Sequence, residues 1–206
     1  IGNGAGKLLT TGGNNTLVGY NAGDAMTTGN KSAIFGRHAG GSATTASGST
    51  FLGYGAGMDV TTGNNNIAIG NDAMNTSGVT AGISGDNNIA IGVNALDAAT
   101  SGYENVAIGL DAMGAGTTTG YTNVAIGRQA GYDMVGGYNH VLIGNTAGAN
   151  LTGARNNIAL GQAALGTATT TEGCVAIGSA ALGGVNSTDA NNTVGVGNEA
   201  LNLLTD

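Results

Sequence analysis

The stretch Asn66-Ile67-Ala68-Ile69-Gly70-Asn71-Asp72-Ala73 decides the fold, because variants of it recur along the whole chain. Ile67 and Ile69 place β-branched side chains at alternate positions, a pattern that favours a short β-strand. Gly70 follows directly and accepts backbone conformations that a Cβ atom would forbid, so it predicts a sharp bend. The stretch therefore indicates one strand and one corner of a repeated unit.

An apolar residue followed by a key glycine marks twelve units, and eight of the eleven spacings between these glycines are 17 residues. An alanine stands three residues after every key glycine, as at Ala73, Ala95 and Ala112. A period of 17 is too short for a helix pair or a propeller blade and fits one coil of a β-solenoid. The sequence predicts an all-β repeat solenoid, a parallel β-roll of about 12 coils that forms a single domain over residues 1–206. The key glycines are Gly2, Gly19, Gly36, Gly53, Gly70, Gly92, Gly109, Gly127, Gly144, Gly161, Gly178 and Gly197.

Composition and charge exclude several classes of protein. The chain has 41 glycines but no proline, and 41% of its residues are hydrophobic, so it is neither collagen-like nor typical of a disordered chain. Its net charge is −7 with five Lys and Arg residues, which cannot make the basic stripe of a nucleic-acid binder. No run of 18 apolar residues occurs, so we expect no membrane insertion.

The strands are apolar on both faces, which suggests that both faces are covered. The residues one and three before the key glycine are large, as at Phe35, Ile67 and Ile69, and we expect them to fill the coil interior. The residue between them, such as Phe51 or Ala68, is then expected to face another chain. This pattern predicts a homo-oligomer, and the alternative is a wider monomeric solenoid. We also expect a second short strand or a tight corner around the alanine that follows each key glycine.

A polar column is expected at the start of each strand. Asparagine recurs four residues before the key glycine, and stacked asparagines can bond to one another along a solenoid. The sequence therefore predicts a polar ladder, with Ser32, Ser49, His140, Cys174 and Thr193 as replacements in other units. The asparagines of this column are Asn15, Asn66, Asn88, Asn105, Asn123 and Asn157.

The repeat Asn-x-Ala-Ile-Gly-x-x-Ala resembles the head repeats of YadA-like trimeric autotransporter adhesins. It is also similar to the Ile-Gly-x-x-Ala-Gly repeats of phage tail fibres and related bacterial fibre proteins, as in residues 63–73. The 17-residue period is longer than the usual autotransporter repeat and favours the tail-fibre-like group. The resemblance implies a left-handed parallel β-roll, a homotrimer around one axis and attachment to a cell surface. Residues 66–73, 88–95, 105–112, 123–130 and 157–164 match best.

No arrangement of residues indicates catalysis, so we expect no enzyme activity, no cofactor and no metal site. The Gly2–Lys7 segment lacks the first glycine and the Ser or Thr of a phosphate-binding loop. His38 and His140 lie at different repeat positions, and Cys174 is the single cysteine. Asp72 and Asp111 leave weak divalent-ion binding as an alternative to a solvated acidic edge.

Two features suggest surface recognition. The spacing from Gly70 to Gly92 is five residues longer than the period, which predicts a loop insertion near residues 76–84. Four tyrosines are the candidate recognition residues for a cell-surface glycan or protein receptor, and the alternative is that they cover turns. These residues are Tyr103, Tyr121, Tyr132 and Tyr138.

We therefore expect a structural or adhesive segment of an extracellular fibre, cut from a longer bacterial surface adhesin or phage tail fibre. It would mediate or support attachment to a cell surface. A purely structural rigid spacer is the first alternative. An ice-binding solenoid is the second, although its flat threonine array is not matched here, because the threonines gather at turns.

Overall fold

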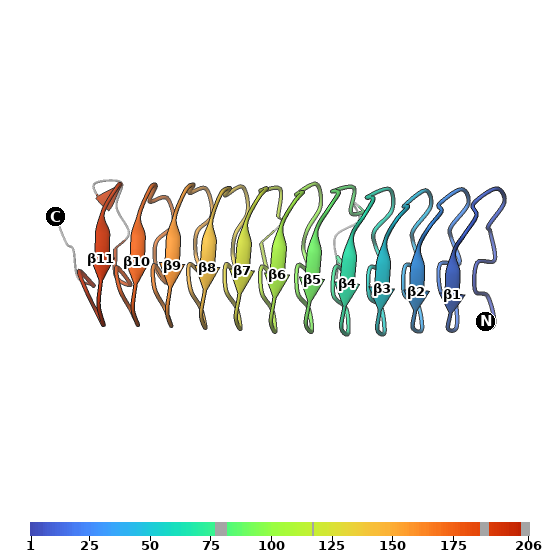
Figure 1. Cartoon of the computed structure of the whole chain (residues 1–206), viewed down its shortest axis with the longest axis horizontal. Coiled ribbons are helices and arrows are strands. Elements are labelled where there is room, and N and C mark those ends of the chain that lie inside the picture. Colours follow the sequence, from blue (N-terminus) through green and yellow to red (C-terminus); the bar gives the residue numbers. More distant parts are fainter. Residues whose placement is uncertain (77–81, 117, 186–189, 203–206) are drawn as a thin grey trace.

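The computed structural model describes residues 1–76, 82–116, 118–185 and 190–202. Eleven short strands follow one another along a straight rod, with the two termini at opposite ends (Figure 1). The strands are β1 Thr16–Val18, β2 Ala33–Phe35, β3 Thr50–Leu52, β4 Ile67–Ile69, β5 Ile89–Ile91, β6 Val106–Ile108, β7 Val124–Ile126, β8 Val141–Ile143, β9 Ile158–Leu160, β10 Val175–Ile177 and β11 Val194–Val196.

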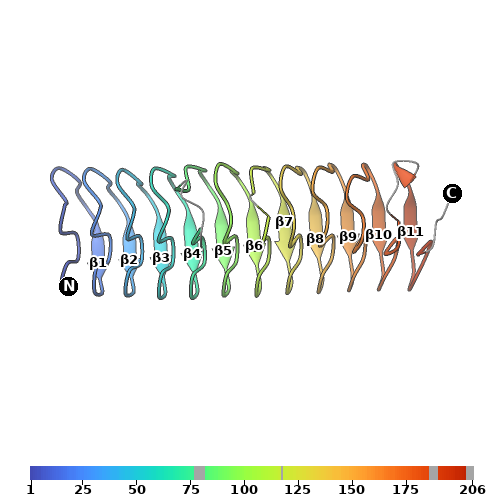
Figure 2. The ribbon, with the colours of Figure 1, turned by 180° about the vertical axis from the view of Figure 1, so that it is seen from behind.

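The strands form one parallel sheet in sequence order, from β1 to β11, so the predicted β-solenoid is confirmed. Pairing is in register throughout: Ala68 of β4 pairs with Phe51 of β3 and Ala90 of β5. The view from the opposite side shows the same unbranched row of coils (Figure 2). At about 4.8 Å per strand, the ten turns from β1 to β11 span roughly 48 Å. Eleven of the twelve key glycines directly follow a strand. The exception is Gly2, which has only Ile1 before it.

Each described coil contains one named strand, so of the two alternatives expected around the repeated alanine the tight corner is confirmed and the second strand is not. Ala73 lies in a turn, with its side chain completely buried. A few isolated parallel bridges link other parts of neighbouring coils, for example Tyr138 with Arg155. Elsewhere, backbone hydrogen bonds between consecutive coils continue through the turns, as from Asp111 N to Val93 O at 3.0 Å. The turns therefore stack as regularly as the strands.

The key glycine is required by both conformation and space. All twelve have φ between 128° and 143°, a region that residues with a Cβ atom rarely adopt. A Cβ atom on Gly109 would lie 2.6 Å from the carbonyl oxygen of Gly127 in the next coil. The glycine column therefore allows the coils to approach at the bend that ends each strand.

The middle residue of each strand points into the coil, which reverses the predicted orientation. Ile34, Phe51, Ala68 and Leu142 are completely buried, whereas the residues on either side of them are half-buried or exposed. Phe35, which was expected inside, is 37% exposed. The reversal is possible because both faces of the strand are apolar, so hydrophobicity alone does not distinguish inside from outside.

Two interior positions exchange size from coil to coil: the middle strand residue and the residue four after the key glycine. Where the first is large, the second is glycine, as with Phe51 and Gly57. Where the first is Ala or Gly, the second is Met or Leu in every coil except that of β7, as with Ala68 and Met74. In the β7 coil both are small, and a Cβ atom on Gly131 would lie 2.8 Å from Met134 Cε, so Met134 fills that space. The interior therefore keeps a nearly constant volume per coil.

The insertion leaves the sheet undisturbed. Residues 77–81 of the region predicted as a loop lie outside the described residues. Beyond them, Ile83 is completely buried and forms a parallel bridge with Val60. Strand β4 still pairs with β5 in register, Ile67 opposite Ile89. The corner between two coils can therefore accept five extra residues without a change in strand register.

Candidate functional site

The outward side of the sheet is an apolar surface that runs the length of the rod. We define the outer strip as the first and third residues of the eleven strands. Thr16 and Thr50 are its polar members, and it contains no charged residue. Several members are well exposed: Leu52 by 49%, Ile143 by 39% and Ile177 by 38%. Sheets whose strands are apolar on both faces are normally covered on both faces.

The size of the outer strip is that of an interface. A strip of about 50 Å by 10 Å gives roughly 500 Å² per chain. Two such strips in contact would bury about 1,000 Å², near the lower bound for a specific protein–protein interface. The large residues of the outer strip, rather than the small ones expected from sequence, are therefore available to another molecule.

The predicted polar ladder is confirmed and lies inside the coil. Asn88, Asn105 and Asn123 are completely buried. The Oδ1 atom of Asn88 accepts a hydrogen bond from the backbone N–H of Asn105 at 3.0 Å. The Nδ2 atom of Asn105 donates to the carbonyl of Gly120, one coil further on, at 2.9 Å. Asn105 thus bonds to both neighbouring coils and satisfies polar groups that would otherwise be unpaired in the interior.

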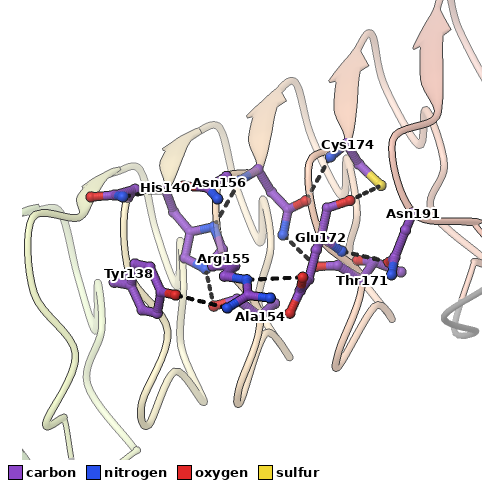
Figure 3. A network of polar contacts seen from close by, with 11 residues as sticks. Tyr138, His140, Ala154, Arg155, Asn156, Thr171, Glu172, Cys174 and Asn191 are labelled. Carbon is purple, nitrogen blue, oxygen red and sulfur yellow. Dashed lines mark hydrogen bonds and ion pairs between the residues drawn. The ribbon is translucent and has the colours of Figure 1, made fainter.

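His140 replaces asparagine in this ladder with the same pattern of donor and acceptor. Its Nδ1 accepts from the backbone N–H of Asn157 at 3.2 Å, and its Nε2 lies 3.0 Å from the carbonyl of Ala154 (Figure 3). A carbonyl accepts only, so Nε2 carries the proton and Nδ1 does not. The ladder therefore holds His140 as one neutral tautomer. Cys174 occupies the same column two coils later, with Sγ 3.1 Å from the carbonyl of Ala190.

Burial lowers the pKa of His140 from 6.5 to about 4, and the hydrogen bond to Ala154 opposes part of this effect. The folded protein therefore binds fewer protons at this site than the unfolded chain does. The sign follows directly: stability is lost as the pH falls from about 6.5 towards 4. His140 is therefore an uncharged, structural residue at physiological pH.

We expect His140→Asn to remove this loss of stability. Between pH 7.5 and pH 5, the free energy of unfolding of the variant should rise relative to that of the wild type by about 2 kcal/mol. Asparagine restores the ladder and has no titrating group. Urea denaturation at both pH values would measure the effect. His38→Asn is the matched control, because His38 lies at a turn position that carries Asn21 in the preceding coil. An equal change in both variants would contradict the assignment to the ladder.

Three of the four tyrosines singled out from the sequence form a stack. The rings of Tyr103, Tyr121 and Tyr138 are nearly parallel, with centroids 5.1 Å and 4.9 Å apart. They stand six residues before their key glycines in consecutive coils, so the coil stacking brings them together. Tyr132 lies in the turn after β7 and is not part of this column. The parallel rings cover one another, which leaves their edges and hydroxyl groups at the surface.

The same column continues with charged residues. Arg155 donates from Nη1 to the hydroxyl of Tyr138 at 3.0 Å and forms an ion pair with Glu172, with Nε 2.9 Å from Oε2 (Figure 3). The hydrogen bonds to Tyr138 and Glu172 raise the pKa of Arg155. Both partners of the ion pair are partly exposed, so the pair adds little stability. This column is therefore a mixed surface ladder whose charges are already satisfied.

A second aromatic cluster was missed in the sequence. Arg37 lies between the rings of Tyr20 and Tyr54, with Cζ 5.8 Å and 5.7 Å from their centroids. His38 meets both rings edge-on, at 5.5 Å and 6.4 Å between centroids. Tyr20, Arg37 and Tyr54 each follow a key glycine directly, so alignment of the 17-residue units would have revealed the cluster. We call these four residues the Arg37 cluster.

Asp72 and Asp111 do not form a shared ion site. Asp72 accepts from the side-chain amides of Asn71 and Asn75, and Asp111 accepts from Asn94. Within the described part of the chain, no group of three or more His, Cys, Asp or Glu residues could hold a metal ion. Among the same residues, no helix is long and apolar enough to cross a membrane. No family model, no curated protein and no solved structure matches the chain.

Proposed function

We propose that the chain is a rigid segment of an extracellular fibre, of the phage tail-fibre or bacterial adhesin kind. In this fibre, further copies of the chain pack side by side along the outer strip. One observation carries the proposal: an apolar strip without charges follows a straight solenoid for its whole described length. Such a strip is costly in water and is stabilised by contact with another apolar surface.

A second copy of the same chain is the occupant that fits best. Copies aligned in parallel would place apolar columns of the same spacing opposite one another along the whole rod. The absence of charge from the strip means that identical strips do not repel each other. The resemblance of the repeat to trimeric fibre proteins favours three chains around one axis. Association would also supply stability without disulfides, since Cys174 is the single cysteine.

The double substitution Ile143→Lys and Ile177→Lys tests the assembly. Both side chains are more than one-third exposed, so lysine can reach water and the single chain should still fold. We expect light scattering to show an oligomer for the wild type and a monomer for the variant, with unchanged circular dichroism. Thr62→Lys is the control, because Thr62 is exposed on a turn before β4 and lies outside the strip. A wild-type monomer at every concentration would contradict the proposed packing.

A binding assay separates an adhesive role from a purely structural one. The fragment would be applied to intact bacterial or host cells, and its retention compared with that of the complete fibre. Retention of the fragment supports adhesion through its own surface. If the complete fibre is retained on cells and this chain alone is not, the chain has the role of a spacer.

A further inference from the structure

The Arg37 cluster presents a guanidinium group in a defined orientation at the surface. Arg37 is exposed, and the flanking rings of Tyr20 and Tyr54 are 48% and 49% exposed. The three side chains come from consecutive coils, so the backbone stacking fixes their spacing. Aromatic rings on both sides stabilise the cation and restrict its rotamers. Arg37 therefore loses less side-chain conformational entropy when it binds a ligand.

The positive charge of Arg37 is not neutralised by a carboxylate of the described chain. The ion pair recorded among the described residues belongs to Arg155, whose charge Glu172 satisfies. Arg37 instead contacts aromatic rings, which leave the hydrogen-bond donors of its guanidinium group available. A planar guanidinium with free donors matches a carboxylate or a phosphate group in a bidentate geometry.

The charge of the whole chain is distributed so that this end of the rod favours anions. Residues 1–62 contain three Lys and Arg and two Asp, a net charge of +1. The remaining 144 residues contain two Arg and ten Asp and Glu, a net charge of −8. A polyanion would therefore be repelled along most of the rod and least opposed near the Arg37 cluster.

We propose that the Arg37 cluster is a binding site for an anionic polysaccharide, whose carboxylate or phosphate groups Arg37 contacts. The exposed tyrosine edges and hydroxyl groups provide apolar contact and hydrogen bonds for the sugar next to the anionic group. This site is separate from the tyrosine stack of Tyr103, Tyr121 and Tyr138. The proposal does not depend on the packing of the outer strip.

The test compares two arginines at the same repeat position. The full chain is immobilised, and binding of alginate, a polyglycerol-phosphate teichoic acid and neutral dextran is measured by biolayer interferometry. Alginate presents carboxylates and the teichoic acid presents phosphates, so the two arms distinguish the sources of the anion. We expect Arg37→Gln to weaken binding of at least one polyanion by about tenfold or more, the loss of a charge-assisted hydrogen bond. Dextran should bind to neither protein.

Arg128→Gln is the matched control. Arg128 also follows a key glycine directly and is exposed, but Leu110 and Asn145 occupy the neighbouring positions in place of tyrosines. We expect this variant to change binding less than twofold. A second variant, Tyr20→Leu with Tyr54→Leu, keeps the charge and removes the rings, and should also weaken binding. No polyanion binding by the wild type, an equal loss in both arginine variants, or a change in native mass for Arg37→Gln would each overturn the proposal.

Discussion

Phe51→Ala is expected to destabilise the protein by about 3 to 5 kcal/mol, because Phe51 is the largest side chain in the interior and is completely buried. The ring fills the space beside Gly57, where a Cβ atom would lie 2.5 Å from Phe51 Cδ1. Its loss leaves a cavity between coils whose backbones are bonded to both neighbours and cannot collapse. Urea denaturation followed by circular dichroism would measure the change.

The other phenylalanine is a matched control for orientation. Phe35 belongs to the outer strip and is 37% exposed, so Phe35→Ala should cost about 1 kcal/mol or less in a single chain. A larger cost for Phe35→Ala than for Phe51→Ala would mean that the strands face the other way. Both substitutions should be measured in the protein that also carries Ile143→Lys and Ile177→Lys. In that protein the outer strip is disrupted, so the effect on folding is separated from the effect on association.

A compensating substitution tests the exchange of size within the coil. Phe51→Ala with Gly57→Met copies the Ala68 and Met74 pair of the next coil. Met74 has φ 53°, close to the 61° of Gly57, so the backbone there accepts methionine. We expect the double variant to recover at least half of the lost stability, whereas Gly57→Met alone should clash with the ring and destabilise. Additive losses in the double variant would contradict the shared space.

Gly109→Ala is expected to destabilise by about 3 to 5 kcal/mol. The φ of 131° at Gly109 lies in a region that is costly for residues with a Cβ atom. The added methyl group would also lie 2.6 Å from the carbonyl oxygen of Gly127, a backbone atom that cannot move without breaking the coil stack. Thermal unfolding of the variant should show a fall in Tm well outside experimental error.

Gly153→Ala is the control for this substitution. A Cβ atom on Gly153 would meet nothing within 4 Å, and its φ lies outside the left-handed region. Alanine there should be neutral or slightly stabilising, because it reduces the freedom of the unfolded chain. Similar losses at both positions would show that glycine content in general, rather than the key column, maintains the fold.

The fold was predictable because its signals are periodic. The key glycines, the buried alanine column and the asparagine ladder all follow from the 17-residue spacing, and the structure confirms each of them. Strand orientation was not predictable from hydrophobicity, because Ile67 and Ala68 are both apolar. The exchange between Phe51 and Gly57, or between Ala68 and Met74, was the available signal. It identifies the middle strand residue as interior, since only residues that share a space need to compensate in volume.

The surface features were harder to predict, because they occur in a few coils and not in all of them. The tyrosines at 103, 121 and 138 are candidate recognition residues because tyrosine suits surface contacts, and their stacking follows from the way the coils align. The Arg37 cluster was missed because Tyr20, Arg37 and Tyr54 are 17 residues apart and look isolated along the chain. Residues that recur in only a few coils become visible when the 17-residue units are aligned, and their contacts depend on which side chains the coils bring together.

Strand contacts in the described chain occur only between consecutive strands. The length of the rod can therefore change during evolution by the gain or loss of whole repeat units. Removal of residues 92–108 would join Ile91 to Gly109 and preserve the Ile-Gly junction, while shortening the rod by roughly 4.8 Å. Duplication of one unit would lengthen it by the same amount. Recombination between similar repeats can therefore change the reach of the molecule while every remaining coil keeps its own neighbours.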